Sequence, residues 1–435
     1  MKSIIIKPTK LNGTVVAPPS KSIGHRAIIC AGLCDGERTV VENIQLSEDI
    51  QATIGAMKAM GAQINEISSQ NNLHSFEIVG NTKPKGIIFF DAKDSGSTLR
   101  FLLPVALCLS NKVIVSGSSA LSKRPLKEYY DLFRENAIEY RVSDLGFPLE
   151  VNGSFKANEF VLKGNVSSQF VSGMLLSFPI MKTANSKVLR LDSKLESKDY
   201  VNLTIDTMRK FGVNTLTDGY KAFKSSEMHY KSCEDSFFVE GDYSQGAFYL
   251  VANAIGNTVE VQGLNPKSLQ GDKKINSIIQ VLTGNGTEQE KAGVVVRNGE
   301  SYFVLDVSNI PDLIPIICVL ASVLPKTNVK LVNGARARLK ESDRLHTTTE
   351  ALNKLGADLT EFEDGIIIRG KEKLKGGATV ASFNDHRIAM AVAIASTVCE
   401  EEIILEDCDA VNKSYPTFWE DFAALGGNYE FNMGK

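Results

Sequence analysis

The chain has 435 residues, of which 43% are hydrophobic and 23% are charged, and its formal net charge is −3. A chain of this length usually forms two domains, and its composition excludes a disordered or fibrous protein. The near-neutral charge excludes a general nucleic-acid-binding protein, so any anion must be bound by locally clustered lysines and arginines.

The cysteines and the apolar segments indicate the compartment. The seven cysteines form no CxxC pair, and several lie in apolar runs, which is typical of thiols kept in a reducing environment. The first apolar stretch is too short for a signal peptide, and no window of about 20 residues is apolar enough to span a membrane. We therefore expect a cytoplasmic protein without a membrane partner.

A helix with one apolar face recurs along the chain and ends each time in a turn at a small residue. Its first copies are IQATIGAMKAM, LKEYYDLFREN and VNLTIDTMRKF. The turns follow at intervals of 70 to 76 residues, at Gly61, Ala137, Gly212, Gly284, Gly356 and Gly426. Glycine suits the end of a helix because it adopts the left-handed conformation without a steric cost. This spacing indicates six structural repeats.

A second helix type recurs with the same period and is apolar on nearly every side. Its copies begin at Ser22, Gly96, Ser167, Tyr243, Pro311 and Asp385. A helix without a polar face must be buried all round, and the β-branched segments between the helices, such as KVIVSG and NVKLVNG, are typical of strands. Chance similarity of helix ends is the alternative, but it does not explain why two helix types recur in phase.

Six repeats predict two domains of three repeats each. The strand in FFVEGDYS begins the fourth repeat, and a further strand precedes the first core helix. We therefore expect an N-terminal domain at residues 21–239 and a C-terminal domain that combines residues 1–20 with 240–435. The chain would then cross between the domains twice, in a protein of the α/β class.

Polar residues gather at the N-terminal ends of the core helices. Such ends present unpaired N–H groups and a partial positive charge, which favour phosphate and carboxylate ligands. In PPSKSIGHRAI, Lys21 and Ser22 precede the apolar run and Arg26 lies within it. A lysine before a helix is often only solvated, but a guanidinium inside an apolar helix requires an anionic partner.

The next repeats carry weaker signals of the same kind. DSGSTLR places a small-residue turn at Gly96, where a ligand can approach the backbone, and Arg124 follows in the loop SKRPL. The third core helix opens with short hydrogen-bonding side chains, those of Ser167, Ser168 and Gln169. Ser197 and Tyr200 lie just before a surface helix in ESKDY. Each has a structural alternative: a solvated loop, a helix cap, a turn or a core tyrosine.

The second half of the chain gives the more specific signals. Asp312 starts a strongly apolar helix, and GARARLKESDRLHT concentrates charged residues. A solvated face usually explains such a run, but the spacing of Lys340 and Arg344 predicts two cations on one helical face. Glu341 beside them is a candidate acid or base. The sixth core helix begins with NDHR, which packing alone does not explain, and NKSYPTF adds a lysine.

Together these motifs resemble those of the 5-enolpyruvylshikimate-3-phosphate synthases over the whole chain. The matching motifs, in order, are PPSKSIGHRA, DSGSTLR, SKRPL, NVSSQF, SKDY, the IPD helix, RLKESDRL, NDHR and NKSYPTF. The resemblance implies two domains, each of three βαβαββ units arranged as an inverted α/β barrel, with buried core helices, outer sheets and a cleft between the domains. It also implies the substrates 3-phosphoshikimate and phosphoenolpyruvate, no metal and no organic cofactor.

The resemblance further implies the roles of individual residues. It implies that 3-phosphoshikimate is bound by Lys21, Ser22, Arg26, Ser167, Ser168, Gln169, Ser197, Tyr200, Asp312 and Lys340. It implies that phosphoenolpyruvate is bound by Lys21, Gly96, Arg124, Gln169, Arg344, Arg387 and Lys413. Asp312 resembles the base and Glu341 the acid, with Lys21 sharing in proton transfer, and the sequence leaves the division of these roles open.

The chain departs from the family pattern at three positions. Arg336 stands where some members have Asn, Ser97 where many have Thr, and Phe101 where many have Pro. Arg336 therefore receives no role. The turn at Gly96, beside which the inhibitor glyphosate binds in this family, is flanked by the other two departures.

Two other functions are compatible with parts of the sequence. The sister enzyme that transfers enolpyruvyl to UDP-N-acetylglucosamine typically has Lys-Asn at the position of Lys21 and Ser22, and a catalytic cysteine on a loop. The segment from Ser116 to Arg124 contains no cysteine. A non-catalytic anion-binding scaffold would not need Asp312 and Glu341 among the cations. We expect the protein to act on small molecules as a monomer, without nucleic acid.

Overall fold

The computed structural model describes residues 2–83, 85–182, 186–225, 229–284, 294–297 and 300–432. Its contacts divide the chain into two compact units. One consists of Pro19–Glu240, which we call the contiguous unit. The other combines Met1–Pro18 with Gly241–Lys435, and we call it the split unit.

The contiguous unit has three four-stranded sheets in the part of it that the structure describes. Each begins with a parallel strand pair and continues antiparallel. The first, in spatial order, has β14 (Ser236–Phe238), β3 (Arg38–Ile44), β5 (Leu73–Val79) and β4 (Gln63–Gln70). The second has β6 (Ile88–Asp91), β7 (Lys112–Ser116), β9 (Leu149–Asn152) and β8 (Glu139–Val142). The third has β10 (Glu159–Leu162), β11 (Val188–Leu191), β13 (Ala222–Ser225) and β12 (Thr215–Asp218).

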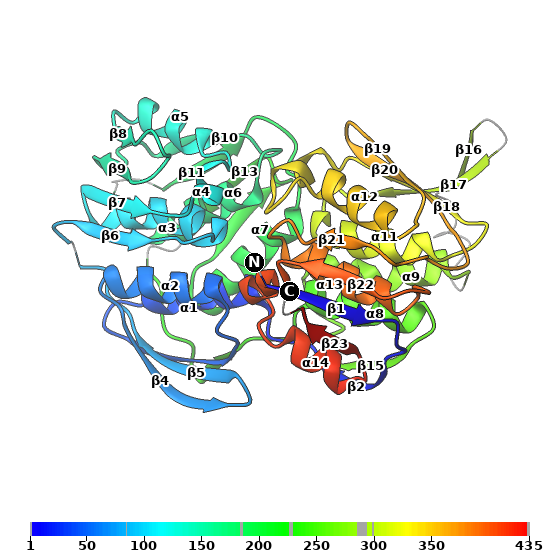
Figure 1. The fold of residues 1–435 in the computed structure, drawn as a ribbon. Helices are drawn as coiled ribbons and strands as arrows, with labels where there is room; N and C mark the ends of the chain where they lie inside the picture. The colour runs from blue at the N-terminus through cyan, green and yellow to red at the C-terminus, as the bar shows by residue number, and fades with distance from the viewer. Residues whose placement is uncertain are drawn as a thin grey trace. The chain divides into compact units, whose positions relative to one another are not determined.

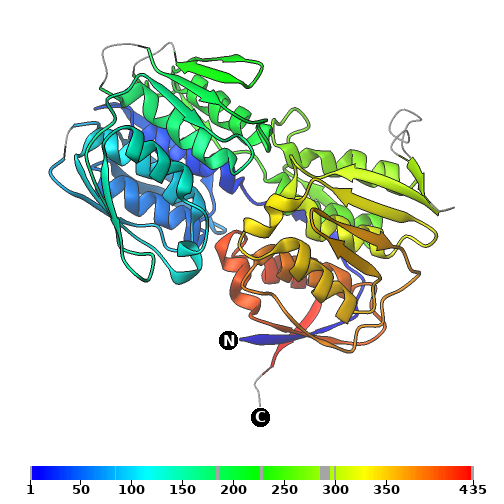
Figure 2. The ribbon, with the colours of Figure 1, turned by 90° about the horizontal axis from the view of Figure 1, so that it is seen from above.

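The helices of this unit are of the two expected types. The core helices are α1 (Lys21–Gly32), α3 (Gly96–Leu109) and α6 (Ser168–Ser177). The half-exposed helices are α2 (Glu48–Ala59), α5 (Lys127–Glu135) and α7 (Lys198–Lys210), and two short helices are α4 (Ser119–Ser122) and η1 (Phe178–Ile180). Figures 1 and 2 show the sheets at the periphery of the unit and the core helices within it.

The split unit repeats this plan with strands from both ends of its sequence. Its two-stranded sheet pairs β2 (Asn12–Val16) with β15 (Thr258–Gln262). Its five-stranded sheet has β16 (Val294–Arg297), β17 (Glu300–Asp306), β18 (Asn328–Val332), β20 (Gly365–Arg369) and β19 (Leu359–Phe362). Its four-stranded sheet has β21 (Thr379–Ala381), β22 (Ile403–Glu406), β1 (Ser3–Lys7) and β23 (Asn428–Phe431).

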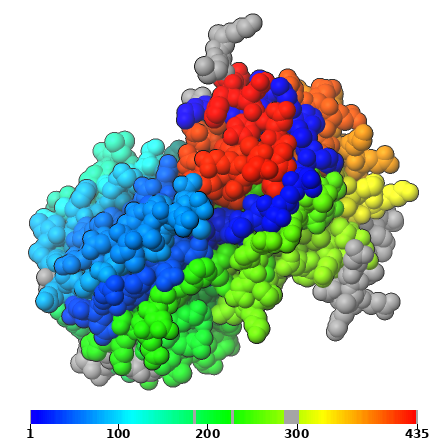
Figure 3. Space-filling model, turned by 90° about the horizontal axis from the view of Figure 1, so that it is seen from below, coloured from blue at the N-terminus to red at the C-terminus, as the bar shows by residue number. Residues whose placement is uncertain are grey.

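Strand β1 lies inside its sheet and not at an edge. It pairs antiparallel with β22 on one side and with β23 on the other. Strand β2 pairs parallel with β15, from Asn12 opposite Thr258 to Val16 opposite Gln262. In Figure 3 the dark-blue N-terminal residues accordingly lie against the red C-terminal residues and against green residues. The N-terminal segment therefore completes a unit whose other residues begin more than 200 positions later.

Two of the core helices of the split unit are buried along their whole length. The core helices of this unit are α8 (Tyr243–Ala254), α11 (Ile314–Ser322) and α13 (His386–Ser396), and every residue of the last two is buried. The outer helices are α9 (Ile275–Leu282), α12 (Arg344–Lys354) and α14 (Phe418–Ala424). The 3-10 helices are η2 (Gly271–Lys274), η3 (Pro311–Leu313), η4 (Ala335–Leu339) and η5 (Cys408–Lys413). The α/β class and the buried core helices expected from the sequence are confirmed.

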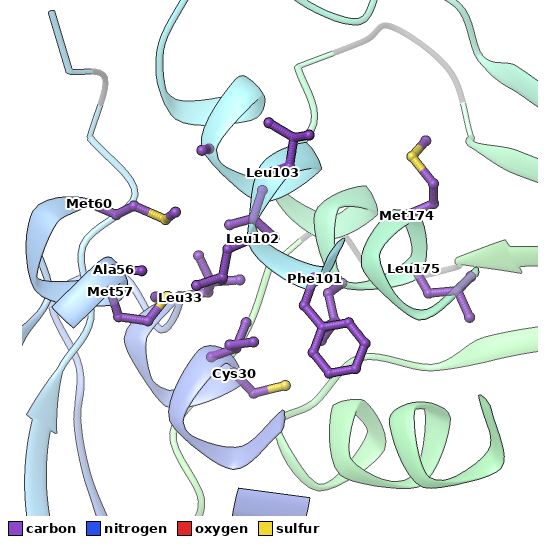
Figure 4. Close-up of a cluster of buried hydrophobic side chains, with 14 of the residues drawn as sticks. Cys30, Leu33, Ala56, Met57, Met60, Phe101, Leu102, Leu103, Met174 and Leu175 are labelled. Atoms are coloured by element: carbon purple, nitrogen blue, oxygen red, sulfur yellow. The ribbon is translucent and has the colours of Figure 1, made fainter. Parts of the chain in front are cut away.

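The core of the contiguous unit is formed where its buried helices meet. Figure 4 shows Leu33, Met57 and Phe101 among the apolar side chains that fill this space. Helices α3 and α6 approach so closely that a Cβ atom on Gly173 would lie 2.2 Å from the carbonyl oxygen of Arg100. The close packing fixes the N-terminal ends of these helices relative to each other, and those ends carry the candidate site residues.

Candidate active site

A buried guanidinium joins three carboxylates in the split unit. Arg344 begins α12 and is 1% exposed. Its Nη1 donates to Asp312 Oδ1 at 2.5 Å, its Nη2 to Glu341 Oε2 at 2.5 Å, and its Nε to Asp385 Oδ2 at 2.8 Å. Burial lowers the pKa of Arg344, but Asp385, Glu341 and Asp312 together hold that pKa well above its usual value. The arginine is therefore permanently charged.

Asp312 is the carboxylate around which the other cations gather. Arg387 Nη2 donates to its Oδ2 at 3.1 Å, and Lys340 Nζ lies 3.3 Å from its Oδ1. Burial acts to raise the pKa of Asp312, but Arg387, Lys340 and Arg344 hold it well below its usual range. Burial also lowers the pKa of Lys340, against the opposing effect of Asp312. The cluster is thus a set of cations and carboxylates that neutralise one another.

The expectation that Lys340 and Arg344 share one helical face was wrong. Lys340 ends the 3-10 helix η4, and α12 begins only at Arg344. The reason is Asp343, whose side chain accepts a hydrogen bond from the His346 N–H at 3.1 Å and so caps the helix. The two cations nevertheless meet, because Asp312 attracts both. Since Arg344 is fully buried, a solvated face does not explain the charged run either.

The start of α13 holds the remaining cations of this unit. Asp385 is fully buried and caps the helix by accepting from the Arg387 N–H at 2.9 Å. Arg387 also donates from Nη1 to the carbonyl oxygen of Ser244 at 3.3 Å. Lys413, at the end of η5, donates to the Asn384 carbonyl at 2.9 Å. A helix N-terminus and two cations therefore face the same region.

In the contiguous unit, Lys21 begins α1 and lies 2.8 Å from Asp49 Oδ2 on α2. Arg26 is buried one turn later. It donates to the hydroxyl of Thr204 at 2.7 Å and to the carbonyls of Ser22 at 2.5 Å and Tyr200 at 2.9 Å. Burial lowers the pKa of Arg26 to about 10, so it stays charged at neutral pH. In the described part of the chain, the hydrogen-bond acceptors of Arg26 are therefore neutral oxygens, and those on α7 join α1 to α7. The sequence had led us to expect an anionic partner instead.

A second group of polar side chains surrounds the N-terminus of α3. Gly96 is the first residue of this helix, and a Cβ atom there would lie 3.0 Å from Arg124 Nη1 and 3.3 Å from Arg100 Nη1. Arg100 donates to Gln169 Oε1 at 2.7 Å, and Gln169 Nε2 donates to the Ser97 hydroxyl at 3.0 Å. The structure therefore brings Gly96, Arg124 and Gln169 together, as the sequence led us to expect.

A buried chain of hydrogen bonds holds this helix end from beneath. His25 Nδ1 lies 2.7 Å from the Thr53 hydroxyl, which lies 2.7 Å from the Thr98 hydroxyl. Thr98 in turn donates to the Ser95 hydroxyl at 2.8 Å, and Ser95 caps α3. Burial, and then Lys21 and Arg26, hold the pKa of His25 well below its usual value, so the ring is neutral. The chain fixes the position of the Gly96 turn.

The remaining predicted residues lie at two helix starts of this unit. Ser167 caps α6 by accepting from the Gln169 N–H at 3.3 Å, and the buried Ser168 begins that helix. Ser197 is the residue before α7 and has a left-handed backbone with φ 51°. Tyr200 lies in the first turn of α7, not before the helix as expected. The serines are therefore helix caps or first-turn residues, and helix N-termini are places where anions bind.

Comparison with known proteins follows this geometry. The family model of EPSP synthase (3-phosphoshikimate 1-carboxyvinyltransferase) matches residues 5–422. The 3-phosphoshikimate 1-carboxyvinyltransferase of Clostridium perfringens (strain ATCC 13124) is 45% identical over 432 residues, covering 98% of this chain and 99% of that protein. The chain belongs to the EPSP synthase family. The enzyme of the same name from Clostridium novyi (strain NT) is 44% identical over 444 residues and covers both chains fully.

Solved structures share the fold of this family member. EPSP synthase from Acinetobacter baumannii matches with a TM-score of 0.74 and 23% identity, covering both chains fully. The enolpyruvyl transferase NikO from Streptomyces tendae matches with a TM-score of 0.73 and 12% identity, covering 100% of this chain and 99% of that one. In the described ranges, no helix is both long and apolar enough to cross a membrane. Nor does any described group of three or more His, Cys, Asp and Glu side chains form a metal site.

Several carboxylates that lie next to the assigned cations were missed in the sequence. Asp49, Asp385 and Asp272 were not assigned, although each contacts or neighbours an assigned cation. Asp385 stood in the motif NDHR and could have been found as a helix cap. Asp49 and Asp272 belong to no sequence motif that would mark them as site residues. Asp272 stands in QGDKK, which is typical of a solvated turn. Only folding shows that these carboxylates are buried.

Replacing Arg344 by alanine should destabilise the protein strongly, because the buried Asp385 and the partly buried Asp312 and Glu341 lose the cation they share. We expect the free energy of unfolding to fall by about 3–5 kcal/mol, as for other broken buried ion pairs. The measurement is urea unfolding followed by circular dichroism. The matched control is Arg369→Ala, since Arg369 is 40% exposed and lies 3.5 Å from Asp358, and we expect its loss to cost about 1 kcal/mol or less. Equal losses for both variants would contradict the central role of Arg344.

Proposed function

We propose that the protein transfers the enolpyruvyl (carboxyvinyl) group of phosphoenolpyruvate to the 5-hydroxyl of 3-phosphoshikimate and releases phosphate. The observation that carries this proposal is the buried cluster of Lys340, Arg344 and Arg387 around the carboxylate of Asp312. The chain belongs to the EPSP synthase family over residues 5–422. This membership disfavours UDP-N-acetylglucosamine as the acceptor.

The binding proposal follows the charges and the helix starts of each unit. We propose that 3-phosphoshikimate is bound by Lys21, Ser22, Arg26, Ser167, Ser168, Gln169, Ser197, Tyr200, Asp312 and Lys340. We propose that phosphoenolpyruvate is bound by Lys21, Gly96, Arg124, Gln169, Arg344, Arg387 and Lys413. Both ligands carry a phosphate and a carboxylate, and helix N-termini with arginine and lysine side chains are the groups that bind such anions. Arg26 would act mainly by fixing the carbonyls of Ser22 and Tyr200.

The addition step needs one proton removed and one added, and the elimination step reverses the transfer at C3. The acceptor hydroxyl loses its proton and attacks C2 of phosphoenolpyruvate while C3 gains a proton. The resulting tetrahedral intermediate then loses phosphate together with a proton from the C3 methyl group, which forms the double bond again. Asp312 would take the proton of the hydroxyl and Glu341 would supply the proton to C3, with Lys21 sharing in proton transfer. Cations on the phosphate and carboxylate would stabilise the developing negative charge. Neither the addition nor the elimination is an oxidation or a reduction. The proposed mechanism uses only side chains of the protein, without an organic cofactor or a metal.

Because the same cations contact Asp312 and would bind the substrates, substrate binding would change the strength of Asp312 as a base. In the described structure, Arg387, Lys340 and Arg344 hold the pKa of Asp312 low, which makes the carboxylate a weak base. Anionic ligands that bind to the same cations would neutralise part of their charge and raise that pKa. Asp312 would therefore become a better proton acceptor only when both substrates are bound. Monomeric state and cytoplasmic location stay predictions.

The test of the function is an assay of phosphate release from phosphoenolpyruvate by the purified protein. We expect release with 3-phosphoshikimate and none with shikimate, which lacks the phosphate that the cations would bind. We also expect none with UDP-N-acetylglucosamine, and no change when a chelator removes divalent ions. Release with shikimate at the same rate, or a requirement for a divalent ion, would refute the proposal.

Removing the proposed base and acid should slow turnover more than it weakens binding. We expect Asp312→Asn and Glu341→Gln each to lower kcat by at least about 10²-fold, the size of a general acid or base contribution. Both changes keep the shape of the side chain, and circular dichroism checks that each variant is folded. The control is Asp358→Asn, at a half-exposed carboxylate. Near-normal kcat in both site variants would mean that other groups transfer the protons.

Glyphosate, which in this family binds in the phosphoenolpyruvate site beside the glycine at position 96, should inhibit competitively with phosphoenolpyruvate. In Gly96→Ala the new methyl group would lie 3.0 Å from Arg124 Nη1 and 3.5 Å from Gln169 Oε1. An inhibitor longer than the substrate should suffer more from this crowding. We expect the inhibition constant to rise at least about tenfold more than KM, a difference of about 1.4 kcal/mol. Gly55→Ala, which adds a methyl group in open space, is the control, and an unchanged ratio of the two constants in Gly96→Ala would contradict this placement.

A further inference from the structure

A further carboxyl group, that of Asp272, lies close enough to the cluster of the split unit to interact electrostatically with Asp312 and Arg387. It is 2% exposed and belongs to the short 3-10 helix η2. Gln270, just before η2, fixes this turn to the start of α8: its Oε1 accepts from the Tyr243 N–H at 2.9 Å and its Nε2 donates to the Gly241 carbonyl at 2.8 Å. The position of Asp272 is therefore set by the backbone around it and does not depend on a flexible loop.

Ser244 connects Asp272 to the arginine that contacts Asp312. The Ser244 hydroxyl donates to Asp272 Oδ2, and the Ser244 carbonyl accepts from Arg387 Nη1 at 3.3 Å. Arg387 Nη2 in turn donates to Asp312 Oδ2 at 3.1 Å. One residue of α8 thus separates Asp272 from an arginine that we propose binds phosphoenolpyruvate.

The charges that face Asp272 come from three neighbouring elements. Burial raises its pKa to about 6, and Asp312 of η3 adds to the rise. Arg387 of α13 and the hydroxyl of Ser244 act in the opposite direction, and Asp242 before α8 raises the pKa further. Helix α9, which follows η2, carries no titratable side chain. The net effect of these neighbours is that the pKa of Asp272 is raised above its usual value.

We propose that Asp272 is a positioning residue that controls the affinity of this cluster for anions. When ionised, it competes with the ligand for the positive charge of Arg387. When protonated, it leaves that charge to the ligand, so binding of phosphoenolpyruvate takes up a proton at Asp272. This inference rests on the proposed function, because it takes the ligand of Arg387 to be phosphoenolpyruvate.

The physical reason is repulsion between like charges in a buried site. A phosphate or carboxylate bound to Arg387 adds negative charge close to Asp272 and Asp312, which favours the neutral form of Asp272. By linkage, the ionised form of Asp272 weakens binding of the same anion to the same extent. The affinity for the anion should therefore fall as the pH rises through the range in which Asp272 ionises.

The experiment compares wild type with Asp272→Asn, whose amide resembles the protonated acid and cannot ionise. KM for phosphoenolpyruvate and kcat are measured from pH 5.5 to 8 with saturating 3-phosphoshikimate. We expect KM of the wild type to rise over this range about three- to tenfold more than KM of Asp272→Asn, since one unit of pKa coupling is a tenfold change in affinity. The ligand phosphate titrates in the same range, but it does so equally in both proteins and cancels in the ratio. We expect kcat to differ less than threefold.

Ser244→Ala gives an independent test, because it should shift the pH dependence of KM, whereas Asp272→Asn should weaken that dependence. Ser244→Ala removes the hydroxyl that stabilises the ionised form of Asp272, so the rise in KM should begin at a higher pH than in wild type. Asp358→Asn, at a half-exposed carboxylate, should keep the wild-type profile. The same pH dependence of KM in wild type, Asp272→Asn and Ser244→Ala would overturn the inference.

A direct measurement of proton uptake separates this inference from the proposed function. Calorimetric titration of phosphoenolpyruvate into the protein, in two buffers of different ionisation enthalpy, counts the protons taken up on binding. We expect uptake in wild type to exceed that in Asp272→Asn near pH 6.5. If no phosphate is released but this difference is found, the proposed function fails and the role of Asp272 stands. Equal uptake in both proteins overturns that role, whatever the activity. If Asp272→Asn does not fold, Ser244→Ala decides in both assays.

Discussion

The geometry of the candidate site depends on the guanidinium of Arg344. This one buried group contacts carboxylates from η3, from the turn before α12 and from the cap of α13. Those segments lie up to 73 residues apart in sequence, between positions 312 and 385. Because a buried carboxylate is unfavourable without a partner, each segment is held at the position where it reaches the arginine. The part of the site that lies in the split unit is therefore held together by its own ion pairs.

The buried helices explain why charge can gather at this place at all. The core helices are apolar along most of their length, so they can lie in the interior, and in α13 the charged side chains are confined to the first turn. There the unpaired N–H groups and the helix dipole favour negative charge. In the described structure the caps Asp242 and Asp385 supply part of that charge. A substrate phosphate would enter a field that already favours anions, and the same field would make additional carboxylates such as Asp272 sensitive to its arrival.

The sequence predicted the fold class and the buried helices, because a helix without a polar face has only one stable environment. It predicted the cations of the site from their position at helix starts and through resemblance to a family. It did not predict how Lys340 and Arg344 meet, since the cap at Asp343 divides the charged run between two elements. It also did not predict Asp272 as part of the cluster. Electrostatic interactions between residues about 40 positions apart, such as 272 and 312, leave no periodic signal in the sequence.

The place of strand β1 has a consequence for the order in which the protein can form during synthesis. The contiguous unit consists of one uninterrupted stretch, so it can fold as soon as Glu240 has left the ribosome. The split unit cannot complete its four-stranded sheet then, because β1 pairs with β22 and with β23, which are made almost last. Strand β1 must therefore wait without a partner until β22 has emerged, and it gains its second partner only with β23. Early capture of this segment by another strand edge is the hazard that such a topology creates.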